Sequence, residues 1–128
     1  VPAFEYAIKA GVDVLELDLA VTKDDVLVVS HDARMNPGFC TGPAEGTRII
    51  REMTLEQLRR WDCGTKKNTA FPKQETVPGA RVPTLDEVLA LAPKGSFHFN
   101  IETKIFIKEP ELTPSPEQFA RLLSDALT

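Results

Sequence analysis

Three carboxylic acids, one histidine and one lysine in this sequence are of the types that together carry out metal-assisted chemistry. They are Glu16, Asp18, His31, Glu102 and Lys104. Carboxylate oxygens are preferred ligands of Mg²⁺ and Ca²⁺, a histidine can transfer a proton near neutral pH, and a lysine can hold an anion such as phosphate. If folding brings these residues together, they predict metal-assisted attack on a phosphate ester.

The first two acids belong to the run Val12–Leu19, which has the pattern of a buried strand. Side chains alternate along a strand, so its leucines share one face, whereas Val14, Glu16 and Asp18 share the other. The two acids then lie roughly 7 Å apart at their Cα atoms. A solvent-facing strand side is the alternative, and the valines that precede the acids on the same face argue against it.

Two later strands are expected to carry the other groups. The apolar run 26–30 ends in the pair His31-Asp32. Residues 97–105 alternate, and their polar face consists of His98, Asn100, Glu102 and Lys104. In each strand the reactive group lies toward the C-terminal end. We expect His98 and Asn100 to belong to the interior or lower rim of the sheet structure rather than to a reaction site.

Helices are expected around these strands. Residues 2–10 form a short helix before Gly11, and capping boxes open helices at Thr54 with Gln57, at Thr84 with Glu87 and at Ser115 with Gln118. The segment 33–83 is rich in proline and glycine and almost without strand alternation. A loop-rich segment of this length is expected to be functional or a small subdomain, with Trp61 and Phe71 in its own small core.

The resulting order of strands and helices is a βα alternation, which predicts a parallel sheet covered by helices. Polar groups near the C-terminal strand ends favour a TIM (βα)8-type barrel over an open sheet, because such barrels build their reaction sites at that rim. A full barrel needs about 250 residues, so this chain of 128 residues is expected to supply roughly half of one.

Each candidate residue also has a purely structural interpretation. Glu102 and Lys104 could form an ion pair, and His31 with Asp32 could form a hydrogen-bonded turn. Glu16 and Asp18 could bind buried backbone amides. The placement of all these groups on strand ends is the observation that favours a site.

Composition excludes several partner classes. Charged residues make up 27% of the chain and the net charge is −4, with no basic patch, so nucleic acid is not an expected partner. No apolar run is long enough to span a membrane. Cys40 and Cys63 lack metal-site spacing and could be free thiols or one loop disulfide.

The order and spacing of these groups resemble the glycerophosphodiester phosphodiesterase family over most of the chain. The resemblance rests on an Ala-Phe helix at residues 3–4, Leu-Glu-Leu-Asp-Leu at 15–19, Val-Val-Ser-His-Asp at 28–32, Arg-Val-Pro-Thr-Leu-Asp-Glu-Val-Leu at 81–89 and Asn-Ile-Glu-Thr-Lys at 100–104. It implies a phospholipase-C-like βα-barrel with a subdomain inserted after the second strand, which corresponds to residues 33–83.

The resemblance also implies the role of each residue. Glu16, Asp18 and Glu102 would hold the divalent metal, Mg²⁺ or Ca²⁺, His31 would be one of two catalytic histidines, and Lys104 would contact the phosphate. The reaction would be hydrolysis of a glycerophosphodiester to glycerol 3-phosphate and an alcohol, within lipid and glycerol metabolism.

One departure from the family pattern limits this expectation. The other histidine, followed by arginine on the first strand, and a Pro-Glu-Asn-Thr-like segment are expected just before Val1, and the last barrel strands after Thr128. The 128 residues alone are therefore expected to be inactive.

Two rival functions remain open at this point. One is a sphingomyelinase-D-like phospholipase, which a hydrophobic insertion would favour, although residues 33–83 are mostly polar. The other is a non-catalytic barrel that binds a phosphorylated ligand. The Pro-Gly-rich insertion and the connector at residues 110–114 resemble exported bacterial members of the family, which favours the periplasm or export without deciding it.

Overall fold

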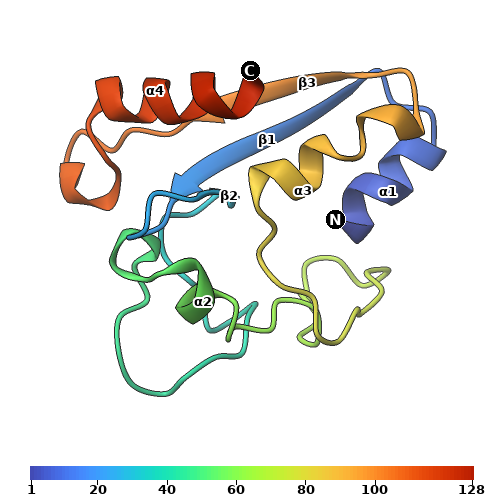
Figure 1. Cartoon of the computed structure of the whole chain (residues 1–128). Helices are drawn as coiled ribbons and strands as arrows, with labels where there is room; N and C mark the ends of the chain where they lie inside the picture. Colours follow the sequence, from blue (N-terminus) through green and yellow to red (C-terminus); the bar gives the residue numbers. More distant parts are fainter.

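A sheet of three strands with helices around it and a long irregular segment beside it make up the chain. The computed structural model describes all residues, 1–128 (Figure 1). In chain order the elements are α1 (Pro2–Lys9), β1 (Val14–Val21), β2 (Leu27–Val29), the 3-10 helix η1 (Ile50–Glu52), α2 (Leu55–Leu58), α3 (Leu85–Leu89), the 3-10 helix η2 (Ala92–Lys94), β3 (His98–Thr103), the 3-10 helix η3 (Pro110–Leu112) and α4 (Pro116–Leu127).

Strand β1 is the centre of the sheet, whose order is β2-β1-β3. It pairs in parallel with β3 over residues 14–19, as the βα alternation predicts. The expectation of a wholly parallel sheet is wrong for β2, which is antiparallel to β1 and shorter than predicted. The reason is local: β1 continues for two residues beyond its pairing with β3, and a tight turn with Asp25 at φ 59° folds β2 back onto that extension.

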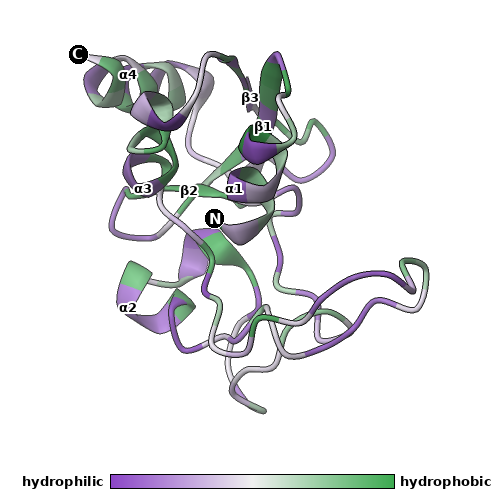
Figure 2. Ribbon diagram, turned by 90° about the vertical axis from the view of Figure 1, so that its right-hand side faces the viewer, coloured by the Kyte–Doolittle hydropathy of each residue, from purple (hydrophilic) through white to green (hydrophobic).

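The leucine face of β1 packs under helices, as predicted. Leu17, Leu19 and Val21 are buried in a cluster that also contains side chains from α3 and α4, with Phe119 of α4 only 1% exposed. Figure 2 shows both helices on the same side of β1 and β3. The other face is less covered than the sequence indicates, because Val14 is half exposed.

The helix starts follow the predicted caps, but their side-chain partners differ. Thr54 and Gln57 form the complete capping box. Thr84 and Ser115 each cap a helix through the side-chain oxygen, yet neither box closes. Glu87 pairs with Arg59 instead, and Gln118 donates to Asp25 at 3.3 Å. Long-range partners therefore replace the local ones at these two boxes.

The segment 33–83 has a core of its own, next to the sheet. Trp61, Ile50, Met53 and Leu58 are buried there together with Ala20 and Val28 of the hairpin. The prediction for Trp61 is confirmed, whereas that for Phe71 is wrong, because its side chain is 64% exposed. Cys40 and Cys63 form a disulfide, which decides between the two states that the sequence left open.

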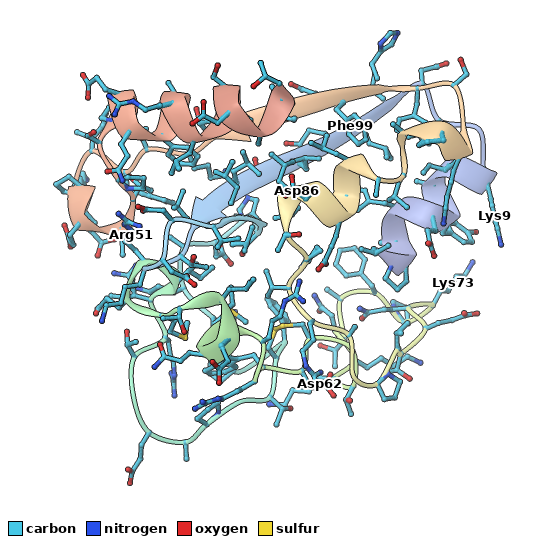
Figure 3. All side chains as sticks on the ribbon, in the orientation of Figure 1. Lys9, Arg51, Asp62, Lys73, Asp86 and Phe99 are labelled. Carbon is cyan, nitrogen blue, oxygen red and sulfur yellow. A yellow bond between two sulfur atoms is a disulfide. The ribbon has the colours of Figure 1, made fainter.

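Asp62, next to that disulfide, organises the loops of the segment (Figure 3). Its carboxylate accepts hydrogen bonds from the backbone N–H groups of Gly64, Gly79 and Thr65 and from the Thr65 hydroxyl. These hydrogen bonds, with those from Gly64 and Gly79 first, lower the pKa of Asp62 to about 2. None of the helices described here is long and apolar enough to cross a membrane.

Candidate metal and phosphate site

The pairing of β1 with β3 brings the three carboxylates of the sequence prediction together. The parallel register places Asp18 opposite Glu102 and Glu16 opposite Asn100. One carboxylate oxygen from each of Glu16, Asp18 and Glu102 lies within 4.8 Å of the others. We call these three residues the acidic cluster. It lies where the parallel pairing ends, which is the strand end that the sequence indicates.

Asp18 is the buried member of the cluster and has an unsatisfied oxygen. Only 8% of the residue is exposed, and its Oδ1 atom is buried without a hydrogen-bond partner. A buried carboxylate oxygen without a partner destabilises the protein by about 1–3 kcal/mol or more, unless a positive charge offsets it. The interpretation that Asp18 serves to bind backbone amides therefore fails for this atom.

The donor set suits a hard divalent cation. Oxygen ligands on opposite sides of one Ca²⁺ lie up to about 5 Å apart, which matches the spacing of the acidic cluster. All three candidate ligands are carboxylates, which favours Mg²⁺, Ca²⁺ or Mn²⁺ over zinc.

Lys104 adds a positive charge at the side of the cluster. Its Nζ atom lies 3.9 Å from Asp18 Oδ1 and 3.9 Å from Glu102 Oε1, beyond hydrogen-bond distance but within range of an ion pair. The side chain of Lys104 is 23% exposed, so its ammonium group still has access to solvent. The lysine offsets one of the three negative charges, and a divalent cation would offset the remaining two.

His31 follows the antiparallel return of β2, on the other side of β1 from β3. The N–H of Ser30 donates to the carbonyl oxygen of Asp18 at 3.0 Å. His31 is therefore the next residue after one that pairs with the buried acid. Its Nδ1 atom lies 2.9 Å from Asp32 Oδ1. The hydrogen bond with Asp32 involves Nδ1, so Nε2 is the ring nitrogen that remains available for proton transfer. The side chain is 76% exposed.

His98 and Asn100 share the polar face of β3 with Glu102, and both are exposed. The structure therefore does not bury them as the interior of a closed sheet, and Asn100 is the register partner of Glu16. Neither side chain forms a hydrogen bond or ion pair with the acidic cluster.

One ion pair beside this edge is not apparent in the sequence. Arg34 donates through Nη2 to Glu109 Oε1 at 2.5 Å and through Nη1 to Glu109 Oε2 at 3.2 Å. The hydrogen bonds with Glu109 raise the pKa of Arg34, and those with Arg34 lower the pKa of Glu109. The residues are 75 positions apart, so no local pattern indicates the pair.

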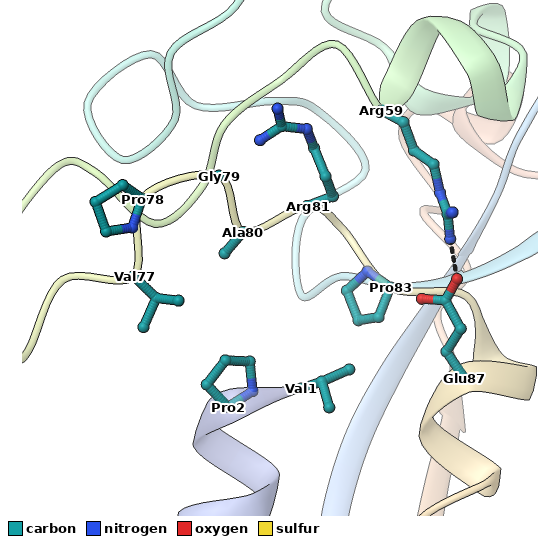
Figure 4. Close-up of a pocket in the computed structure, with 10 residues that line it drawn as sticks. All are labelled: Val1, Pro2, Arg59, Val77, Pro78, Gly79, Ala80, Arg81, Pro83 and Glu87. Atoms are coloured by element: carbon teal, nitrogen blue, oxygen red, sulfur yellow. Dashed lines mark hydrogen bonds and ion pairs between the residues drawn. The ribbon is translucent and has the colours of Figure 1, made fainter.

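One pocket of the surface lies elsewhere (Figure 4). It has a volume of about 310 Å³ and lies between Val1 and Pro2, the loop 77–83 and the Arg59–Glu87 ion pair. None of the acids of the acidic cluster lines it, and both charges of the ion pair are already partnered. The pocket therefore contains none of the groups that the sequence predicts for the reaction.

The comparison with known protein families gives a match over nearly the whole chain. The model of the glycerophosphoryl diester phosphodiesterase family matches residues 1–124. The chain belongs to this family. The resemblance found in the sequence is thereby confirmed over nearly the whole chain.

Curated relatives agree with the family assignment. A glycerophosphodiester phosphodiesterase of Caldanaerobacter subterraneus subsp. tengcongensis is 36% identical over 104 residues, which cover 81% of this chain and 38% of the relative. One of Bacillus subtilis is 33% identical over 118 residues, which cover 91% of this chain and 37% of the relative. The chain thus spans little more than a third of the length of these relatives.

Solved structures show the same fold. A glycerophosphoryl diester phosphodiesterase from Silicibacter pomeroyi superposes with a TM-score of 0.85 at 24% identity, over 99% of this chain and 47% of that one. A phosphodiesterase from Oleispira antarctica, solved with its product sn-glycerol-3-phosphate, has a TM-score of 0.71 at 19% identity, over 98% of this chain and 44% of that one. The chain therefore has the fold of part of a TIM-type barrel, as the sequence predicts.

Proposed function

We propose that the natural-length protein hydrolyses glycerophosphodiesters to glycerol 3-phosphate and an alcohol, with the help of a divalent metal. The observation that carries the proposal is the acidic cluster, in which three carboxylates converge and the buried Oδ1 of Asp18 has no partner. Membership of the family supports the reaction class. The product bound in the Oleispira antarctica phosphodiesterase supports glycerol 3-phosphate as the phosphorylated product.

In this proposal Glu16, Asp18 and Glu102 hold Mg²⁺ or Ca²⁺, which supplies Lewis acidity at the phosphate. Lys104 contacts a phosphate oxygen, because its ammonium group lies beside the acidic cluster and retains access to solvent. The positive charge would offset the negative charge that develops as water attacks phosphorus.

His31 is the proton carrier of this chain in the proposed reaction. Its Nδ1 is held by Asp32, which leaves Nε2 to accept or return a proton. Hydrolysis needs one proton taken from the attacking water and one given to the leaving alcohol, so a second group is expected to share this work. The resemblance implies that this group is a second histidine.

The domain organisation proposed from the sequence fits this scheme. Residues 1–128 would be one part of the catalytic barrel, with 33–83 as the inserted subdomain of the family. The core around Trp61, which the segment shares with Ala20 and Val28 of the sheet, and the disulfide support the idea that this segment is a subdomain packed onto the barrel.

The test is the release of glycerol 3-phosphate from glycerophosphocholine by the natural-length protein. We expect chelation by EDTA to abolish release and added Mg²⁺ or Ca²⁺ to restore it. His31→Ala should lower kcat by at least about 100-fold, because general acid–base groups contribute roughly that much or more. Glu16→Gln should also lower kcat, because it removes a proposed metal ligand. Glu45→Gln, an exposed acid in the insertion, is the matched control and should retain activity.

Isothermal titration with Mn²⁺ separates metal binding from turnover. Glu16→Gln and Glu102→Gln should weaken binding, whereas His31→Ala should leave it unchanged. Unaltered turnover in both Glu16→Gln and His31→Ala would refute the site assignment. Metal binding without any turnover of phosphodiesters would favour the non-catalytic ligand-binding alternative.

A further inference from the structure

The Arg34–Glu109 ion pair joins the two segments that leave the sheet on either side of the acidic cluster. Strand β1 lies between β2 and β3, so the segments that follow β2 and β3 start on opposite sides of it. The first carries His31 and leads to Arg34, and the second carries Lys104 and leads to Glu109. The two hydrogen bonds between Arg34 and Glu109 close these segments into a ring with β1.

Both ends of the ion pair are attached to ordered backbone. Ala33 and Met35, on either side of Arg34, are buried, and their backbone groups bond to Ile50 and Arg48. On the other side the N–H of Glu109 donates to Phe106, and its carbonyl accepts from Leu112, which is 2% exposed. The ion pair therefore joins the turn around Glu109 to the anchored backbone around Arg34.

The residues between the sheet and the ion pair are less restrained. His31 is exposed, and Ile107 is 92% exposed in the turn that links Lys104 to Glu109. An ion pair that fixes the far ends of both segments limits where His31 and Lys104 can move. The acids of the cluster, in contrast, are held by the strand pairing itself.

We propose that Arg34 and Glu109 are positioning residues, which hold the His31 segment and the Lys104 segment in place relative to the acidic cluster. The inference rests on the proposed function for its effect on the rate. Its structural part, the ordering of the two segments by the ion pair, stands independently. Arg34 and Glu109 touch neither the metal ligands nor the proposed reacting groups.

A double-mutant cycle in the natural-length protein tests the effect on the rate. Arg34→Ala and Glu109→Ala should each lower kcat/KM for glycerophosphocholine by about two- to fivefold, the range expected for a pair exposed by nearly half. The double variant should be no slower than either single variant. The Mn²⁺ affinity should change by less than about twofold, because the acids are positioned by the strands. Arg60→Ala, which breaks the exposed Arg60–Glu56 pair, is the matched control and should leave the rate unchanged.

Hydrogen exchange tests the ordering independently of activity. In Arg34→Ala and Glu109→Ala, peptides that cover residues 31–36 and 104–112 should exchange faster, whereas a peptide of β1 should not. Additive losses in the cycle, or unchanged exchange in both peptides, would overturn the proposal. A wild-type protein without phosphodiesterase activity would instead refute the proposed function, and the exchange data would then decide on the ordering alone.

Discussion

Different interactions stabilise two regions of the chain: the strand pair β1 and β3, which carries the acidic cluster, and the insertion 33–83. The strands bury leucines and a phenylalanine under helices in regular secondary structure. The insertion has few regular elements, and it combines a core around Trp61 with the Cys40–Cys63 disulfide and the hydrogen bonds of Asp62. Where the hydrogen-bond ladders of strands and helices are absent, side chains must form hydrogen bonds with the backbone N–H and C=O groups. A disulfide then restrains the loops.

This difference indicates that the two regions respond to different perturbations. A loss of apolar volume should affect the strand pair first, whereas reduction or acid should affect the insertion first. The chain contains one tryptophan, Trp61, so its fluorescence reports on the insertion, while far-UV circular dichroism reports on the whole chain.

The largest effect is expected from removal of Phe119. This side chain is 1% exposed and packs against β1 and α3. Phe119→Ala should lower the free energy of unfolding by about 3–5 kcal/mol, because a large buried cavity remains. Urea unfolding measures the change, and Phe71→Ala, at a 64% exposed site, should shift it by no more than about 0.5 kcal/mol. Equal losses in the two variants would contradict the assignment of the core.

Removal of the disulfide comes next. The double variant Cys40→Ser/Cys63→Ser opens a loop with a sequence separation of 23, for which chain entropy predicts a loss of about 3 kcal/mol. Limited proteolysis should then cut the insertion before the strand pair, and Mn²⁺ binding at the acidic cluster should persist. Reduction of the wild type by dithiothreitol is the matching treatment. Loss of metal binding at the same time would show that the regions are not independent.

Gly42 offers a sharper perturbation of the insertion core. A Cβ atom at this residue would lie 2.1 Å from the Trp61 ring. Gly42→Ala should therefore displace Trp61 and destabilise the protein by about 1–3 kcal/mol, with a red shift of its fluorescence. At Gly46 a Cβ atom meets nothing within 4 Å but the backbone has φ +99°. Gly46→Ala should thus leave the fluorescence unshifted, and a shift as large as that of Gly42→Ala would contradict the packing argument.

The smallest effect is a loosening of the insertion by acid. Asp62 has a pKa of about 2 in the folded protein, below the ordinary value of 3.8 for a free side chain. The stabilisation that this difference provides is fully present above pH 3.8 and is lost as the pH falls through about 2. Trp61 fluorescence should therefore change in that range before the circular dichroism does. Asp62→Asn should remove this pH dependence, and an identical transition in that variant would show that another group causes it.

The sequence by itself determined which groups share a face and where helices begin. Strand alternation puts Glu16 and Asp18 on one side of β1 and the leucines on the other, since the period of two is a property of any strand. The caps at Thr54, Thr84 and Ser115 follow from hydrogen bonds within a single turn. Both kinds of pattern depend on neighbours a few residues away, so they can be predicted without the rest of the fold.

Only the tertiary structure decided which distant groups meet. The register that sets Asp18 opposite Glu102, the antiparallel return of β2, the Cys40–Cys63 bond and the Arg34–Glu109 pair all join residues far apart in the chain or depend on how a turn closes. Such pairings depend on burying the leucine face and on closing long loops, which are properties of the whole chain. The acids of the proposed metal site could therefore be predicted from the sequence, whereas the pairing of the segments around them could not.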